Sequence, residues 1–223
     1  MAPKFFNNHK ELIDSLEKNK YEFSLSQIKY NEKDHTKQYP FVWVSILSKE
    51  LRQFHSGFSI VFATSDARLP IVFVAEQSGS TLCRVNESNL PIINAMKIVE
   101  EKVRELLPAH QQHMLKPILR TSTHPLYPES RSISIKTKYA AIDHTKCEVT
   151  KVAVKNTLTK YILQLQKLCL HEGEYKCQWT VMAIGGMEPS SPADLPSSCG
   201  SSNGQQQTDD DLFNMMAETA EAY

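Results

Sequence analysis

The stretch TLTKYILQLQKLCLHEGEYKCQWTVMAI (157–184) decides the fold class of this chain. Its first half fits two structures, because apolar residues recur at helical spacing from Leu158 to Cys169 but alternate as in a strand from Tyr161 to Leu165. Its second half has the pattern of a strand, and Gly173 lies between the halves in a polar turn. We therefore expect an antiparallel hairpin here rather than a helix.

Strand patterns recur on both sides of residue 100. Short spacers that contain Gly57, Asp66 and Gly79 suit an antiparallel meander of the early strands in one sheet. The expected strands are rich in β-branched and aromatic residues: 21–30, 41–47 (FVWVSIL), 58–63 (FSIVFA), 70–76 (PIVFVAE), the weaker 81–85 (TLCRV), 132–141 (SISIKTKYAA) and 147–154 (CEVTKVAV).

Residues 90–107 carry the clearest helical pattern in the chain. Ser88 or Asn89 is placed to cap this helix, and Pro108 ends it. Its apolar side comprises Ile92, Met96, Val99, Val103 and Leu106. The following residues, 109–130, are basic, rich in proline and without periodicity, and a connection of this length inside a compact domain is often functional.

A shorter helix is expected near the N-terminus. Asn7 or Asn8 is placed to cap it, Glu11 is placed to answer the cap, and the helical pattern ends at Lys18.

These elements together predict the fold class. Five or more antiparallel strands with a helix between the early and late groups is the layout of oligonucleotide-binding barrels. We expect an α+β, mainly β domain over residues 1–187, built as an antiparallel barrel of this kind with one inserted amphipathic helix. A mixed α+β sandwich is the alternative. Residues 188–223 are rich in Ser, Pro, Gly and Gln and cannot bury a core, so we expect a flexible linker and a disordered acidic tail.

Charge separates these two parts of the chain. All 25 Lys and Arg residues lie in residues 1–187, whereas 7 of the 25 Asp and Glu residues lie in residues 188–223. The domain therefore has 25 basic and 18 acidic residues, a formal charge of +7, and the tail carries −7. A basic domain with an acidic arm indicates a polyanionic partner.

The sequence offers little that points to catalysis. It has no GxGxxG, GxxxxGK[ST] or HExxH motif. The five cysteines are scattered and never in CxxC form, so we expect reduced thiols rather than disulfides or zinc ligands. His110 and His113 are three residues apart but have no further ligands in their pattern. We expect no enzyme, no cofactor and no metal site.

The apolar runs are far shorter than a bilayer span, and the N-terminal residues lack the apolar core of a secretory signal. We therefore expect no membrane association and an intracellular protein. Its compartment would be the nucleus or a viral replication compartment in a eukaryotic host, and the cytoplasm in a bacterial or phage system.

Basic and aromatic residues are interleaved on the expected strands. Single-stranded nucleic acid is held by cations along its phosphates and by rings on which its bases stack. The candidate residues are Trp43, Lys116, Arg120, Arg131, Lys136, Lys138, Tyr139, Lys151, Lys155, Lys160, Lys176 and Trp179, with Phe41 and Tyr161 beside them. The alternative is that the rings belong to the core and the lysines to the solvated face of half-buried strands.

The tail carries a more specific pattern. Asp209, Asp210 and Asp211 precede Leu212 and Phe213 after the polar linker. This layout is similar to that of the bacterial and phage single-stranded DNA-binding proteins, in which a linker and an acidic, hydrophobic tip follow a barrel. The resemblance implies that the tip recruits replication proteins and competes with DNA for the basic surface. Ten residues follow Phe213 here, a departure that puts recognition through the terminal carboxylate in doubt.

We therefore expect a single-stranded DNA-binding protein of viral or phage replication, whose tail recruits partners and inhibits binding. The alternative is a non-enzymatic adaptor or regulatory protein that uses the same tail and has dispersed lysines. An RNA-binding nucleoprotein is a third option, because nothing in the sequence distinguishes DNA from RNA. A homo-oligomer is also left open.

Overall fold

The computed structural model describes residues 3–30, 40–49, 57–64, 67–75, 79–121, 130–137, 141–142, 145–146 and 156–189. These residues form a mainly β structure with two α-helices and one 3-10 helix, so the α+β, mainly β class is confirmed. The elements are β1 (Pro3–Phe6), α1 (His9–Glu17), β2 (Tyr21–Leu25), β3 (Lys29–Tyr30), β4 (Pro40–Ser48), β5 (Ser59–Thr64), β6 (Leu69–Ala75), β7 (Ser80–Arg84), α2 (Leu90–Leu106), η1 (Ala109–Met114), β8 (Arg120–Thr121), β9 (Arg131–Lys136), β10 (Ala141–Ile142), β11 (Thr145–Lys146), β12 (Asn156–His171) and β13 (Glu174–Pro189). The expected strand 147–154 lies outside the described residues.

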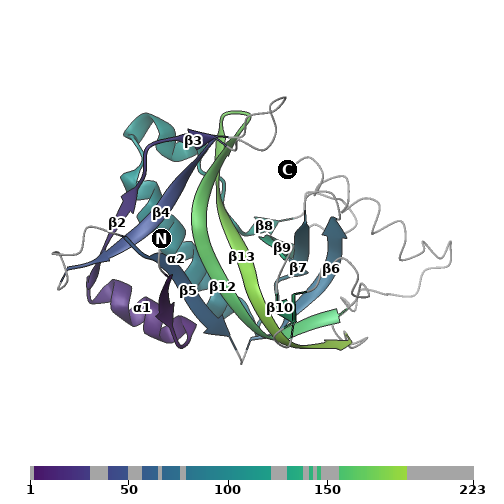
Figure 1. Ribbon diagram of the computed structural model, residues 1–223. Coiled ribbons are helices and arrows are strands. Elements are labelled where there is room, and N and C mark those ends of the chain that lie inside the picture. The colour runs from purple at the N-terminus through teal and green to yellow at the C-terminus, as the bar shows by residue number, and fades with distance from the viewer. Residues whose placement is uncertain are drawn as a thin grey trace.

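The hairpin of β12 and β13 runs through the middle of the sheet (Figure 1). The strand interpretation of residues 157–170 is confirmed, and the two strands pair from His171 with Glu174 to Asn156 with Pro189. Glu172 and Gly173 form the turn with φ values of 50° and 80°. Positive φ at both turn positions matches the right-handed twist of a hairpin, which explains the glycine.

Strand β12 organises the sheet because it is long enough to pair with four strands. Beyond β13, it pairs with β4 at Lys167 to Cys169, with β5 at Tyr161 to Leu165, and with β6 at Thr157 and Leu158. The early strands do lie in one sheet, but β12 separates β5 from β6, so the expected simple meander is wrong. The sheet is also mixed, because β1–β5, β9–β13 and β10–β13 are parallel pairs.

A closed oligonucleotide-binding barrel is not confirmed. The described strands form an open sheet in which β9 and β13 meet through a single residue pair, Lys136 with Thr180. The helix α2 does follow the early strands and precede the late ones, as expected.

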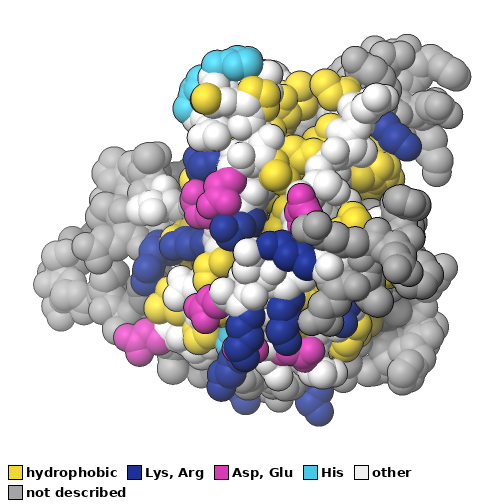
Figure 2. Space-filling view, turned by 90° about the vertical axis from the view of Figure 1, so that its left-hand side faces the viewer, with side chains coloured by type: hydrophobic (Ala, Val, Ile, Leu, Met, Phe, Trp, Pro, Cys, Tyr) yellow, Lys and Arg dark blue, Asp and Glu magenta, His cyan; other side chains and the backbone are white. Residues whose placement is uncertain are grey.

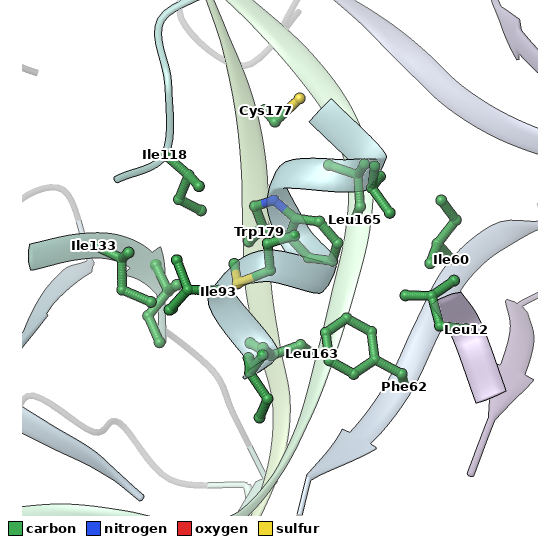
Figure 3. Close-up of a cluster of buried hydrophobic side chains, with 14 of the residues drawn as sticks. Leu12, Ile60, Phe62, Ile93, Ile118, Ile133, Leu163, Leu165, Cys177 and Trp179 are labelled. Carbon is green, nitrogen blue, oxygen red and sulfur yellow. The ribbon is translucent and has the colours of Figure 1, made fainter. Parts of the chain in front are cut away.

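The helix α2 packs against the concave inner side of this sheet. Its residues Ile92, Ile93 and Met96 are fully buried, and Figure 3 places α2 beside Trp179 of β13 and Phe62 of β5. The predicted apolar side is confirmed except for Leu106, which is exposed while Leu107 is buried. Burial of this stripe fixes the helix on the sheet.

The short helix α1 has the predicted cap. Asn8 Oδ1 accepts a hydrogen bond from the amide of Glu11 at 2.9 Å, and the Glu11 carboxylate accepts one from the amide of Asn7 at 2.8 Å. Leu12 and Leu16 are buried on its inner side. The first bond satisfies an amide donor that the first turn of a helix leaves without a partner, and the second holds the residue before the cap.

Alternation along the central strands defines two faces. In β4, Val42, Val44 and Ile46 are buried, whereas the intervening residues are only partly buried. In β13, Cys177 and Trp179 are buried between partly exposed neighbours. We call the side turned away from α2 the outer face; its residues are Phe41, Trp43, Lys167, Cys169, Lys176 and Gln178, with Lys136 and Arg120 at its β9 side.

Candidate nucleic-acid interface

Strand register brings the outer-face residues together. Trp43 lies opposite Lys167, and Phe41 lies opposite Cys169, across the β4–β12 pair. Across the β12–β13 pair, Cys169 lies opposite Lys176. Side chains of directly opposed residues point to the same side of a sheet, so aromatic and basic side chains from three strands share one surface.

Two rings form the aromatic part of this surface. The ring centres of Phe41 and Trp43 are 5.3 Å apart, with an angle of 84° between the planes. The Lys167 ammonium lies 4.9 Å from the centre of the Phe41 ring. Both rings are partly exposed. They lie on the same face because side chains two positions apart along a strand point to the same side. Partly exposed rings beside a cation suit the stacking of an unpaired base next to its phosphate.

Basic residues continue the surface toward β8 and β9. Lys136 lies opposite Thr180 of β13, and Arg120 lies opposite Ser132 of β9. Burial raises the pKa of the Cys169 thiol, and the positive charges of Lys167, Lys136 and Lys176 oppose this rise. The charges of all three lysines therefore reach the Cys169 thiol on the outer face.

Lys176 lies among like charges. Burial, and then the positive charge of Arg120, lowers the pKa of Lys176 from 10.5 to about 8, and Lys116 adds to the effect. Lys116 forms an ion pair of 2.8 Å with Glu174, and this hydrogen bond is the main cause that lowers the pKa of Glu174. Three cations, Lys116, Arg120 and Lys176, thus lie near two acids, Glu174 and Glu172, and the excess of positive charge favours a bound anion.

The stretch from Leu115 through β8 supplies two of these cations, Lys116 and Arg120. Leu115 forms a bridge with Tyr175, and the amide of Lys116 donates to the Tyr175 carbonyl at 2.9 Å. The segment belongs to residues 109–130, the basic, irregular connection that the sequence indicated as functional.

The structure places four of the predicted nucleic-acid residues on the outer face, Trp43, Arg120, Lys136 and Lys176, and a fifth, Lys116, lies beside them through its ion pair with Glu174. Arg131 is exposed at the start of β9, but alternation places it on the side of the buried Ile133. Lys160 is exposed opposite Gly186, far along the hairpin from Lys176. Outside the described residues lie Lys138, Tyr139, Lys151, Lys155 and the tail residues Asp209, Asp210, Asp211, Leu212 and Phe213.

The prediction for Trp179 is wrong. Its side chain is 1% exposed and lies against Phe62, with ring centres 5.8 Å apart (Figure 3). Tyr161, the further candidate beside Lys160, is also buried. The alternation of Cys177, Trp179 and Val181 with polar residues held the signal that Trp179 faces inward.

Lys167 is a candidate that the sequence reading missed. A register shift between Leu165 and Lys167 changes the alternation of β12, so Leu165 and Leu168 point inward while Lys167 points outward. Such a bulge cannot be located without the partner strand.

Basic side chains elsewhere are mixed with acidic ones. Figure 2 shows Lys and Arg interspersed with Asp and Glu over the lower part of the face that includes α1. There Lys18 pairs with Asp14 at 2.8 Å.

Among the described residues, no three His, Cys, Asp or Glu side chains gather as metal ligands would, and His110 and His113 are exposed on η1. None of their helices is long and apolar enough to cross a membrane. The described Cys83, Cys169 and Cys177 are free thiols, as expected.

No family model and no curated protein matches the chain. The interpretation of the outer face therefore depends on its geometry and charge alone.

Proposed function

We propose that this protein binds single-stranded nucleic acid on the outer face, and that its ligand is single-stranded DNA of a viral or phage replication system. The observation that carries this proposal is the Phe41–Trp43 pair beside Lys167, next to the basic residues of β13 and β9. An unpaired strand needs aromatic rings on which its bases stack and cations that contact its phosphates, and this surface carries both.

In this proposal the bases and the phosphates of the strand contact different residues. Bases stack on Phe41 and Trp43, while phosphates contact Lys167, Lys176 and the cations beyond them. A duplex hides its base faces, so the rings favour a single strand. A phosphate at Lys176 would offset the repulsion from Arg120 and raise the depressed pKa of Lys176.

The acidic tail gives this site a competitor. Residues 188–223 carry a charge of −7 against +7 on the domain, and the segment Asp209–Phe213 would recruit a replication partner when DNA displaces it. An oligonucleotide-binding barrel remains part of the proposal. The long antiparallel β12–β13 hairpin and the position of α2 between the early and late strands support it.

The adaptor alternative expects dispersed lysines and no affinity for nucleic acid. The concentration of Lys116, Lys136, Lys167 and Lys176 around one face favours nucleic-acid binding instead.

Binding to poly-dT and poly-U over a range of salt concentrations tests the proposal. We expect affinity that falls steeply with salt, and tighter binding at low salt once residues 189–223 are deleted. Equal affinity of the two forms would remove the tail from the mechanism, and absence of binding by both would refute the function. Tighter binding to poly-U would favour the RNA-binding option.

A further inference from the structure

Glu100 is a buried acid on α2 that touches the segment behind the outer face. It is 3% exposed, and its Oε2 accepts a hydrogen bond from the amide of Ile118 at 3.1 Å. Its Oε1 is buried and has no hydrogen-bond partner among the described residues. A buried carboxylate with one free oxygen is costly, which raises the question of what this contact does.

The Ile118 amide is the midpoint of the segment that carries two cations of the outer face. Lys116 precedes it by two residues, and Arg120 follows it by two. The segment is attached to Tyr175 on one side of Ile118 and to β9 through β8 on the other. Between these two backbone attachments, the Ile118 amide is held by the titratable carboxylate of Glu100.

Several charged groups surround Glu100. On α2 these are Arg104, Glu101 and Lys97, and on β13 the neighbour is Cys177. Burial raises the pKa of Glu100 from 4.5 to about 7, against the lowering effects of the Ile118 hydrogen bond and of Arg104. Burial also raises the pKa of Cys177 well above its ordinary value, so this thiol stays neutral beside Glu100.

We propose that Glu100 is a positioning residue whose ionised carboxylate holds Ile118, and through it Lys116 and Arg120, in place for a polyanion. This inference rests on the proposed function. A hydrogen bond to a charged acceptor is about twice as strong as one to a neutral acceptor, so ionisation tightens the attachment. Preorganised cations bind more tightly because less freedom is lost on binding. Affinity should therefore gain a contribution as Glu100 ionises.

The substitution Glu100→Gln tests this idea directly. The glutamine carbonyl can still accept from the Ile118 amide, but it is neutral at every pH. At pH 8 we expect the wild-type protein to bind a dT oligonucleotide about 3–5-fold more tightly than the variant, which corresponds to about 1 kcal/mol. At pH 6 the two affinities should converge. Lys176 titrates in both proteins, so its effect cancels in the ratio.

The control Glu105→Gln removes an exposed acid from the same helix without touching Ile118. Loss of negative charge alone strengthens polyanion binding, so a simple field effect predicts slightly tighter binding by either variant. A ratio of affinities for Glu100→Gln that is the same at pH 6 and pH 8 would overturn the proposal.

Hydrogen exchange of the Ile118 amide in the free wild-type protein gives a readout that needs neither nucleic acid nor the variant. We expect its protection, relative to neighbouring amides, to rise with pH around 7. Protection that does not change with pH overturns the positioning role. If no oligonucleotide binds while this protection follows pH, the proposed function fails and the attachment through Glu100 stands.

Discussion

The ammonium of Lys167 lies over the ring of Phe41, 4.9 Å from its centre, and joins the aromatic and basic parts of the outer face. Lys167 is also the residue opposite Trp43 in the β4–β12 pair, and Trp43 packs edge-to-face against Phe41. A base stacked on these rings would bring its phosphate within reach of the same lysine. This contact makes three residues, from two strands, a single binding unit.

Removal of the rings should weaken binding without unfolding the protein. Trp43→Ala and Phe41→Ala are each expected to cost about 1–3 kcal/mol of binding free energy, the usual value of one stacked base. The salt dependence should remain, because the phosphate contacts persist. Fluorescence titration with a dT oligonucleotide measures both. Unchanged affinity in both variants would show that the strand does not cross β4.

Removal of a cation should have a different signature. Lys176→Ala or Lys167→Ala should reduce the slope of log affinity against log salt by about 0.7 for each lost phosphate contact. Lys18→Ala is the matched control, because Lys18 pairs with Asp14 on α1, away from the outer face. Equal slopes for all three variants would place the nucleic acid elsewhere.

Local patterns in the sequence predicted the elements well, whereas the order of the strands depends on contacts between distant residues. The hairpin could be inferred because its alternation and its glycine are neighbours in sequence. The place of β12 between β5 and β6 could not, since it depends on pairs such as Gln164 with Ser59, whose side chains are 2.8 Å apart and 105 residues distant in the chain.

The two tryptophans show which parts of the site a local sequence pattern could predict. Trp43 lies in FVWVSIL, which is apolar on both sides, so the sequence could not assign its face. Trp179 lies in a stretch that does alternate, and its inward position was readable. The outward position of Lys167 could not be predicted from the sequence, because the bulge that turns it outward arises from pairing with β13.

Trp179 should therefore contribute to stability and not to binding. Trp179→Ala is expected to lower the free energy of unfolding by about 3–5 kcal/mol, because a large cavity opens against Phe62. Trp179→Phe should cost less, since the indole N–H has no hydrogen-bond partner among the described residues and the ring contact is retained. Chemical denaturation measures the stability. If the Trp179→Phe protein is folded but binds DNA much more weakly, Trp179 takes part in binding and the prediction is wrong.

The buried position of Glu100 predicts a pH dependence of stability that has nothing to do with a ligand. Its pKa is about 7 in the folded protein and near 4.5 when exposed, so the folded state retains a proton that the unfolded state releases. The favourable contribution of Glu100 is therefore complete below pH 4.5 and is lost as pH rises to about 7.

Glu100→Gln removes this dependence, because glutamine does not titrate. The free energy of unfolding of the variant, minus that of the wild-type protein, should increase by about 2–3 kcal/mol between pH 4.5 and pH 8, at about 1.4 kcal/mol for each pKa unit. The absolute difference at one pH also contains the cost of burying an amide, so only its change with pH reports on Glu100. Urea denaturation at several pH values measures the change. A constant difference would mean that Glu100 keeps its ordinary pKa, and that its charge cannot respond to pH in the neutral range.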